Sequence, residues 1–562
     1  MYLSEIKPFG ALPTQRQINH FKKYGKKAFF HFGVNTFSNL EWGNGDEGEQ
    51  LFNPTETDVR QWIKTVKAAG FTLAILTVKH HDGFCLWPSN FTEHSIRKSP
   101  YKNGNGDILR EFVDACHEFD MAVGIYISPW DRNSDLWGTP EYSNFFNNQL
   151  TEILTQYGKI DEIWWDGAGS TETPYDWGMW AHSIRNHQPE AVIFGSLGAT
   201  DYVEMHWVGN EVGYAGDPHY PTINPECVRT ETTSEMNSGT FGGERFIIAE
   251  VDTSIRPGWF YHADQDHFVK SPKELVDLWF KSVGSSAIML LNFPPDRRGI
   301  VHEIDAKNAI ESHRIISKAL SVNYAQSATV TADSLREGFY ADSIVNGNYN
   351  AVYVADDSNI TPVIDIKLAK KETFDTFVIG EYVELGVRVN GYKVEAFTDG
   401  KWKMLADKKS IGYQKAVYFG KTTTDHIRIT IYSAAAAPVL REFSLYSFDD
   451  AGYSSAAERK PIAEGFDILK NLSTEVTYGE NTVTAMLGGL FPFNTIKFNG
   501  AGFSEYELYI FNGTQYYLAS KGKTNGDEVT ITLDETIKFS YQFKLKTDKT
   551  PDESINLRVY EM

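Results

Sequence analysis

The feature that most constrains the fold is an alternation, across the first 320 residues, between short apolar runs and segments with helical spacing. In the helical segments apolar residues return every three to four positions, for example over residues 59–67 before Gly70 and over 108–119 after Asp107. A glycine just after a helix and an aspartate just before one are common terminal residues. The apolar runs are expected to form buried parallel strands over residues 28–34, 72–78, 121–128, 161–165, 192–195, 246–251 and 287–292.

Strands and helices that alternate in about eight units predict a parallel α/β fold of the (β/α)8 barrel type, which we assign to residues 1–321. A doubly wound parallel sheet is the competing arrangement. Its dinucleotide-binding form is disfavoured because no glycine-rich phosphate loop follows the first apolar run.

The pattern changes after residue 321, where helical periodicity ends and short alternating strands begin. Two all-β, sandwich-like domains are expected, over residues 322–448 and 457–562, with a polar linker at 449–459 between them. In the first of these domains strands are predicted at 374–379, 392–397, 416–419, 427–431 and 441–446. In the second they are predicted near 482–486, 506–511, 528–533 and 555–560.

The charge of the chain excludes several function classes. Lys plus Arg number 53 against 74 Asp plus Glu, a net charge of −21, which argues against nucleic-acid binding and against an anionic membrane surface. No apolar run approaches the ~18 residues of a membrane-spanning helix. A hydrophobic fraction of 41% with 14% aromatic residues excludes a disordered chain. The three cysteines are too few for a disulfide framework, so packing must stabilise the domains.

In a barrel of this type the catalytic residues lie at the carboxyl ends of the strands. There this sequence offers a histidine, an aromatic ring or a carboxylate, at His31, Glu41, Trp42, His80, His81, Tyr126, Asp166, Glu211, Glu250 and Trp259. Polar groups combined with aromatic faces suit a sugar, which presents hydroxyls around an apolar C–H face. The sequence therefore predicts a carbohydrate pocket.

Hydrolysis of a glycosidic bond requires two carboxyl groups. Asp166 is the candidate nucleophile because it follows the bulky apolar residues 163–165; the alternative is a buried aspartate that pairs with a base or caps the next helix. Glu211 and Glu250 compete for the role of proton donor. Partial burial beside Trp207 would raise the pKa of Glu211, but the residues alone leave the choice open.

The run His80-His81-Asp82 invites a metal-site interpretation. Adjacent residues on a strand point to opposite faces, so two neighbouring histidines are poorly placed to bind one ion. Neither a metal nor another cofactor is expected, and hydrogen bonding to sugar hydroxyls is the favoured role for both histidines. A serine hydrolase is disfavoured because no Gly-x-Ser-x-Gly motif is present.

The N-terminal 320 residues resemble the catalytic barrel of glycoside hydrolase family 29, the retaining α-L-fucosidases. The matching motifs are His31-Phe32-Gly33, Glu41-Trp42-Gly43, Lys79-His80-His81-Asp82-Gly83-Phe84 and Trp164-Trp165-Asp166-Gly167. The resemblance implies Asp166 as the nucleophile, contacts from His31, His80 and His81 to fucose hydroxyls, and Trp259 as a pocket wall.

Two further resemblances refine this expectation. Residues 31–37 and 207–211 are similar to the branch that prefers α-1,3/1,4-linked fucose in branched glycans, which favours Glu211 over Glu250 as acid/base. Residues 322–448 resemble a discoidin-like (coagulation factor 5/8 C-type) sandwich; the role of residues 457–562 is unknown.

The favoured function is a retaining exo-glycosidase that acts on fucosylated oligosaccharides or glycoconjugate glycans. A carbohydrate-binding protein on an inactive barrel and a barrel glycosidase for another sugar, such as a galactosidase, are the alternatives. Because such glycans lie outside the cytoplasm, a periplasmic or secreted protein whose signal peptide has been removed is expected, with a cytoplasmic location as the alternative.

Overall fold

The computed structural model describes residues 3–169, 175–195, 197–230, 232–462, 466–471, 474–512 and 515–562, and only the backbone of residues 197 and 534–539. Eight parallel strands close into a barrel in the order β1-β10-β9-β6-β5-β4-β3-β2, which confirms the predicted fold. They are β1 (Lys26–Phe30), β2 (Leu73–Lys79), β3 (Ala122–Ile127), β4 (Glu162–Trp164), β5 (Val192–Phe194), β6 (Met205–Trp207), β9 (Ile248–Ser254) and β10 (Ile288–Asn292).

Seven of these strands coincide with predicted apolar runs, and β6 is the one the prediction missed. It has only three residues, and His206 at its centre breaks the apolar pattern. The predicted run at 246–251 is also displaced, because β9 begins at Ile248 and continues to Ser254. This shift moves Glu250 from the end of a strand into its interior.

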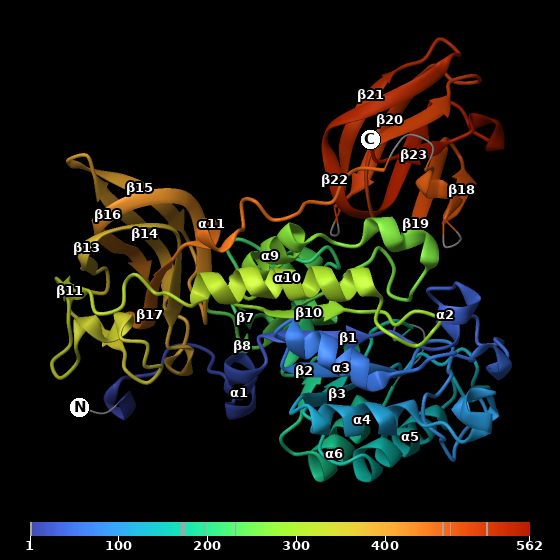
Figure 1. The fold of residues 1–562 in the computed structure, drawn as a ribbon, viewed down its shortest axis with the longest axis horizontal. Helices are drawn as coiled ribbons and strands as arrows, with labels where there is room; N and C mark the ends of the chain where they lie inside the picture. Colours follow the sequence, from blue (N-terminus) through green and yellow to red (C-terminus); the bar gives the residue numbers. More distant parts are fainter. Residues whose placement is uncertain are drawn as a thin grey trace.

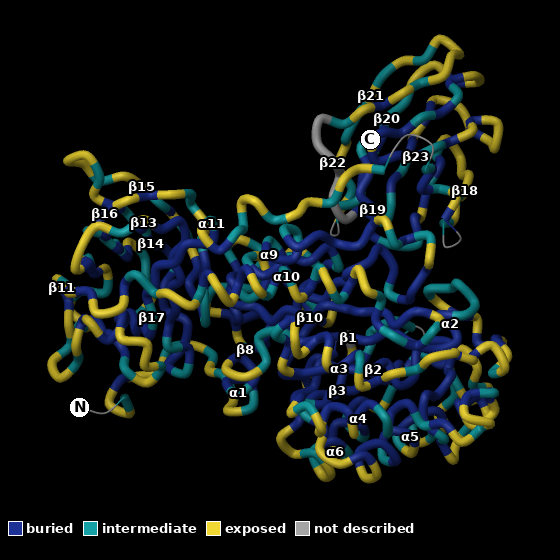
Figure 2. The backbone as a smooth tube through the Cα atoms, in the orientation of Figure 1, coloured by how far each residue is buried: buried dark blue, intermediate teal, exposed yellow. Residues whose placement is uncertain are grey.

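The helices around the barrel begin where the sequence provides capping residues. The Asp107 carboxylate accepts a hydrogen bond from the backbone N–H of Arg110 at the start of α4, and Ser271 and Glu274 form a capping box at the start of α9. The outer layer contains α3 (Val59–Ala68), α4 (Ile108–Glu118), α5 (Tyr142–Gln156), α6 (Trp177–His187), α9 (Pro272–Lys281) and α10 (Glu303–Leu320). Helix α1 (Gln15–Lys23) packs across the amino-terminal ends of the strands, where Gln17 donates hydrogen bonds to the carbonyls of Glu204 and Phe246. Figure 2 shows the barrel strands buried beneath this layer.

The middle domain is a seven-stranded antiparallel sheet. Its strands are β11 (Thr329–Ala332), β12 (Tyr353–Val354), β13 (Val363–Glu381), β14 (Val389–Thr398), β15 (Lys401–Lys408), β16 (Lys415–Ala434) and β17 (Val439–Tyr446). The predicted strands at 416–419 and 427–431 are two parts of β16, which pairs with β13 through register shifts that bend both strands around one core. The domain lies at the end of the barrel that α1 covers (Figure 1), where the Tyr220 hydroxyl donates to Asn390 Oδ1 over 2.5 Å.

The segment predicted as a linker begins with a short helix, α11 (Phe448–Ala451). The ring of Phe448 packs on Trp279 and Phe280 of α9, with centroids 5.6 and 4.7 Å apart. The chain then crosses to a six-stranded antiparallel sheet. This C-terminal sheet contains β18 (Glu475–Gly479), β19 (Thr482–Asn499), β20 (Glu505–Phe511), β21 (Tyr516–Lys523), β22 (Glu528–Thr547) and β23 (Arg558–Tyr560).

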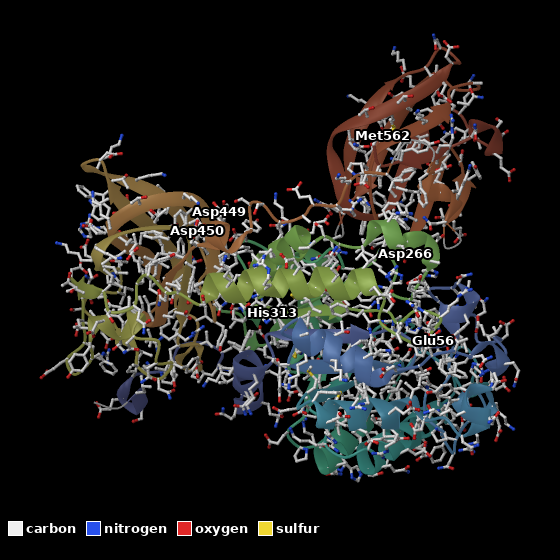
Figure 3. The ribbon with its side chains drawn as sticks, in the orientation of Figure 1. Glu56, Asp266, His313, Asp449, Asp450 and Met562 are labelled. Carbon is white, nitrogen blue, oxygen red and sulfur yellow. The ribbon has the colours of Figure 1, made fainter. Side chains whose placement is uncertain are left out.

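The two β-domains occupy opposite ends of the barrel. In Figure 1 the middle domain lies at the left, and the C-terminal sheet stands at the upper right, nearer to α2 (Val34–Ser38), which follows the carboxyl end of β1. Asp266, labelled in Figure 3, marks the barrel segment beneath this sheet. Within the described ranges, no helix has the length and apolar character required to cross a membrane.

Candidate active site

A small cavity of about 100 Å³ opens at the carboxyl end of the barrel. Its lining residues are Phe29, His31, Trp42, His80, His81, Tyr126, Trp164, Asp166, Ala168, Glu211, Asp252 and Trp259. This set includes every residue predicted from the strand ends except Glu41 and Glu250. Pockets for drug-sized ligands measure ~300–1,000 Å³, so this cavity matches a single small ring rather than an oligosaccharide.

Asp166 lies just beyond β4 with both carboxylate oxygens engaged. The hydroxyl of Tyr126 donates to Oδ2 over 2.7 Å, and the backbone N–H of Ala168 donates to Oδ1 over 2.8 Å. His81 Nε2 lies 3.7 Å from Oδ2. Burial and the Asp166 charge raise the pKa of Tyr126 well above its ordinary value, so its hydroxyl remains a donor. These two donors fix the position of the Asp166 carboxylate beside the cavity.

Glu211 follows β6 on a tight turn. Gly209 has a φ of +88°, and a Cβ at this position would lie 2.6 Å from the carbonyl oxygen of Thr233, so the turn requires glycine. Asn210 fixes the next bend, because its Oδ1 accepts from the backbone N–H of Val212 and its Nδ2 donates to the carbonyl of Tyr214. Burial, reinforced by the charges of Asp166 and Glu41, raises the pKa of Glu211 to about 7.

The three predicted histidines line the same cavity as neutral rings. Burial lowers the pKa of His31 to about 3 and holds those of His80 and His81 below their ordinary value. His31 Nδ1 donates to Asn292 Oδ1 over 2.9 Å. His81 Nδ1 donates to the Ser128 hydroxyl over 2.8 Å, and that hydroxyl donates to the carbonyl of Trp130. Nε2 of each of these two rings is therefore an acceptor.

The placement of His80 and His81 corrects the expectation that they face opposite ways. Strand β2 ends at Lys79, so the alternation of a strand does not extend to them. Their ring centroids are 4.1 Å apart, and both rings line the cavity. In the part of the chain that the structure describes, no group of three or more His, Cys, Asp or Glu side chains forms a metal site.

Glu41 supports the wall of the cavity from behind. Its carboxylate accepts hydrogen bonds from the backbone N–H groups of Trp259 and Phe260, over 2.7 and 3.2 Å, and lies 2.6 Å from His262 Nε2. These contacts fix the loop that carries the Trp259 ring. Trp42, the neighbour of Glu41, lies at the rim with 56% of its surface exposed.

Glu250 lies one layer below the cavity, because β9 continues four residues past it. Lys27 Nζ lies 2.7 Å from one Glu250 oxygen and 2.5 Å from Glu162, while Trp164 Nε1 donates to the other Glu250 oxygen over 2.7 Å. Lys27, Glu162 and Glu250 are all fully buried. Burial raises the pKa of Glu250 to about 7, as for Glu211, so access to the cavity and not pKa separates the two glutamates.

Substitution of Lys27 by methionine is expected to lower the free energy of unfolding by about 3–5 kcal/mol, since it leaves two carboxyl groups buried without their cation. Urea unfolding followed by tryptophan fluorescence measures this loss. Lys64→Met is the matched control, because Lys64 is exposed on α3 and an exposed change should stay within about 0.5 kcal/mol. Equal stability of the two variants would contradict the proposed importance of the buried cluster.

Four residues that line the cavity were not among the predicted site residues, namely Phe29, Trp164, Ala168 and Asp252. The alternation of side chains along a strand could have found Asp252, which lies two residues from Glu250 on β9 and shares its inward face. Phe29 and Trp164 lie at the carboxyl ends of β1 and β4, close in sequence to His31 and Asp166. Asp252 is almost fully buried, and burial raises its pKa well above the ordinary value.

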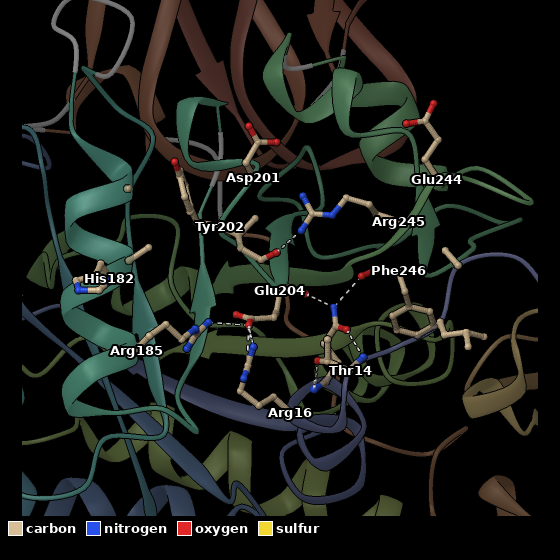
Figure 4. Close-up of a pocket in the computed structure, with 16 residues that line it drawn as sticks. Thr14, Arg16, His182, Arg185, Asp201, Tyr202, Glu204, Glu244, Arg245 and Phe246 are labelled. Atoms are coloured by element: carbon tan, nitrogen blue, oxygen red, sulfur yellow. Dashed lines mark hydrogen bonds and ion pairs between the residues drawn. The ribbon is translucent and has the colours of Figure 1, made fainter.

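A larger cavity, of about 670 Å³, lies at the opposite end of the barrel (Figure 4). Glu204, which immediately precedes β6, accepts hydrogen bonds there from Arg16 over 2.8 Å and from Arg185 over 2.6 Å. Arg245 donates instead to the carbonyls of Thr200 and Val203. Polar groups that satisfy one another in this way stabilise the amino-terminal end of the barrel, which is the structural end of this fold.

Comparison with known proteins identifies the family. The family model described as alpha-L-fucosidase matches residues 13–312, more than half of the chain. Alpha-L-fucosidase 1 of Arabidopsis thaliana is 33% identical over 80% of this chain and 90% of its own length. A solved structure from Bacteroides thetaiotaomicron superposes with a TM-score of 0.77 at 40% identity, covering 79% of this chain and 99% of that one.

A GH29 fucosidase of Ruminococcus gnavus, solved in complex with fucose, superposes with a TM-score of 0.72 at 31% identity. It covers 79% of this chain and 96% of its own. The chain belongs to the α-L-fucosidase family, glycoside hydrolase family 29, and a fucose-containing glycan as its substrate is consistent with that family and with the fucose complex.

Proposed function

We propose that the protein is a retaining exo-α-L-fucosidase in which Asp166 is the nucleophile and Glu211 the acid/base. The observation that carries this assignment is a pair of carboxyl groups that line one cavity in opposite environments. Asp166 accepts hydrogen bonds from the Tyr126 hydroxyl and the backbone N–H of Ala168, whereas burial keeps Glu211 protonated up to about pH 7. Such a pair supplies a nucleophile and a general acid at the same pH.

The reaction proceeds in two displacements. Asp166 attacks the anomeric carbon while Glu211 gives its proton to the departing glycosidic oxygen, so that a fucosyl ester on Asp166 forms and the saccharide leaves. The Glu211 carboxylate then takes a proton from water, whose oxygen attacks the same carbon and releases fucose and free Asp166. Two inversions restore the starting configuration of fucose.

The neutral histidines suit the hydroxyls of the bound fucose. Nε2 of His31 and Nε2 of His81 accept from a sugar O–H, because the Nδ1 atom of each ring is the donor to a fixed protein group. Tyr126, Trp42 and Trp259 add ring surface against which an apolar sugar face packs. Glu41 contributes through the loop that positions Trp259.

We propose α-1,3/1,4-linked fucose in branched glycans as the natural substrate. The support is the resemblance of residues 31–37 and 207–211 to the branch of the family with that preference. Fucose release from trisaccharides that carry α-1,2, α-1,3, α-1,4 and α-1,6 linkages tests it. Comparable rates on all four linkages, or a preference for α-1,2 or α-1,6, would exclude this specificity.

We also propose that the middle domain is discoidin-like and that the enzyme acts in the periplasm or outside the cell. The first rests on the resemblance of residues 322–448, and the second on the location of fucosylated glycans outside the cytoplasm. Fractionation of cells that make the native protein, followed by immunoblotting, tests the location. Recovery of the enzyme only with cytosolic markers would overturn it.

The value of kcat/KM should fall as the pH rises above about 7. Glu211 must be protonated to act as acid, and its protonated fraction falls tenfold for each pH unit above a pKa of about 7. Initial rates on a trisaccharide substrate between pH 5 and pH 9 measure this limb. Glu211→Gln, which cannot ionise, should lack it, and an unchanged alkaline limb in that variant would contradict the assignment.

A further inference from the structure

The C-terminal sheet touches the loop that forms one wall of the cavity. The backbone N–H of Leu490 donates to the carbonyl of Pro257 over 2.8 Å, two residues before Trp259. A Cβ on Gly489 would lie 2.7 Å from the carbonyl carbon of Pro257 and 2.9 Å from Gly258 N, so the close approach requires glycine. The C-terminal sheet therefore rests directly on the active-site loop.

An apolar contact further along the same loop secures this junction. Phe268 is 3% exposed and belongs to the core of the C-terminal domain rather than to that of the barrel. Its ring packs edge-on against Phe491 and Phe466, with centroids 5.0 and 5.4 Å apart. A shared core of this kind holds the two parts in one fixed arrangement. Asp266, two residues before Phe268, lies beneath the C-terminal sheet in Figure 3.

Tyr541 of β22 lies at this junction. Phe491 pairs with Ser540, so Tyr541 follows immediately beside the irregular part of β19 that contains Gly489 and Leu490. Its ring meets Phe511 edge-on at 5.3 Å, and the side chain is partly exposed. Burial, and after it the negative charge of Glu211, raises the pKa of the Tyr541 hydroxyl. Tyr541 thus lies beside the segment of β19 whose Leu490 contacts the loop that carries Trp259.

The reaction requires the departing saccharide to lie beside Glu211. The general acid protonates the oxygen that links fucose to the rest of the glycan. The first sugar of the departing saccharide therefore lies next to the carboxyl group of this acid. A cavity of about 100 Å³ matches one small ring, and the leaving saccharide must therefore rest on surfaces outside it. The middle domain lies at the opposite end of the barrel (Figure 1), whereas the C-terminal sheet contacts the loop that carries Trp259.

We propose that the C-terminal domain completes the active site, and that Tyr541 forms part of a subsite for the saccharide from which fucose is removed. This inference rests on the assignment of Glu211 as the acid/base. An aromatic ring beside the scissile oxygen packs against the C–H face of a sugar, and its hydroxyl offers a donor and an acceptor to sugar hydroxyls. The domain then contributes to substrate choice as well as to stability.

The test compares Tyr541→Ala with wild type on two substrates. One is the fucosylated trisaccharide that wild type cleaves best, and the other is α-L-fucosyl fluoride, whose leaving group is a single atom. The ratio of kcat/KM for the trisaccharide to that for the fluoride should fall at least tenfold in Tyr541→Ala, mainly through KM. Tyr541→Phe should retain more of the ratio, because the ring remains.

Tyr517→Ala is the matched control, since Tyr517 is a partly exposed tyrosine on β21 of the same sheet, and its ratio should equal that of wild type. Thermal unfolding of each variant verifies the fold. A Tyr541→Ala ratio within twofold of wild type would overturn the proposal, as would a wild type that cleaves the fluoride but no trisaccharide. Failure of the Glu211 assignment is detected separately, by a Glu211→Gln variant that keeps full activity on the trisaccharide.

Discussion

Replacement of Asp166 by asparagine is expected to reduce kcat/KM for every fucoside by about 10³-fold or more, which corresponds to ~4 kcal/mol of lost transition-state stabilisation. The amide cannot form the fucosyl ester, although it occupies the same volume beside Tyr126 and Ala168. Steady-state rates on both an oligosaccharide and an aryl fucoside measure the loss. The loss should be similar on the two substrates, because the nucleophile acts whichever group leaves.

Asp135→Asn provides the matched control, since Asp135 is exposed on the loop that follows β3 at the same end of the barrel, and this variant should behave as wild type. A second variant, Asp166→Gly, tests the role itself. Azide can enter the vacated space and attack the anomeric carbon once, which gives the β-fucosyl azide with inverted configuration. Rescue without that product, or a loss below about tenfold in Asp166→Asn, would contradict the assignment.

Replacement of Glu211 by glutamine should cost about 10²–10⁴-fold on a fucosylated oligosaccharide, the usual contribution of a general acid or base. The loss should be smaller for the first step on an aryl fucoside with an acidic phenol, because that leaving group departs without a proton. Release of the phenol should then show a rapid burst, since removal of fucose from Asp166 still lacks its base. Stopped-flow absorbance measures the burst.

Glu250→Gln distinguishes the two candidate acids. This residue binds Lys27 and Trp164 below the cavity, so its replacement should lower the melting temperature more than Glu211→Gln does. It should preserve the alkaline limb of the pH profile. The assignment is wrong if Glu250→Gln, at unchanged stability, loses oligosaccharide activity while Glu211→Gln keeps it.

The barrel could be predicted from the sequence because its strands are apolar runs and its helices have clear ends, as at Asp107 and Gly70. The strand that was not predicted, β6, is three residues long and contains His206. A strand so short has no periodicity of its own, and only its neighbours in the closed sheet define it.

The sequence predicted the candidate site less completely than it predicted the barrel. Strand-end residues such as His31 and Asp166 were identified, but the depth of Glu250 depends on where β9 ends, which composition does not reveal. The layering of side chains inside the barrel explains why Glu250 binds Lys27 while Asp252 lines the cavity. The contact between Leu490 and Pro257 is a long-range domain contact, and no local pattern could have predicted it.

Covalent trapping tests the central claim most directly. A 2-deoxy-2-fluoro-α-L-fucosyl fluoride should react once and then stall, because the fluorine at C2 slows both oxocarbenium-like steps while fluoride remains a good leaving group. Mass spectrometry of the digested protein is predicted to find one fluorofucosyl group, on the peptide that contains Asp166. An adduct on the peptide of Glu211 or Glu250, or slow turnover of the compound with inverted product and no adduct, would contradict the account.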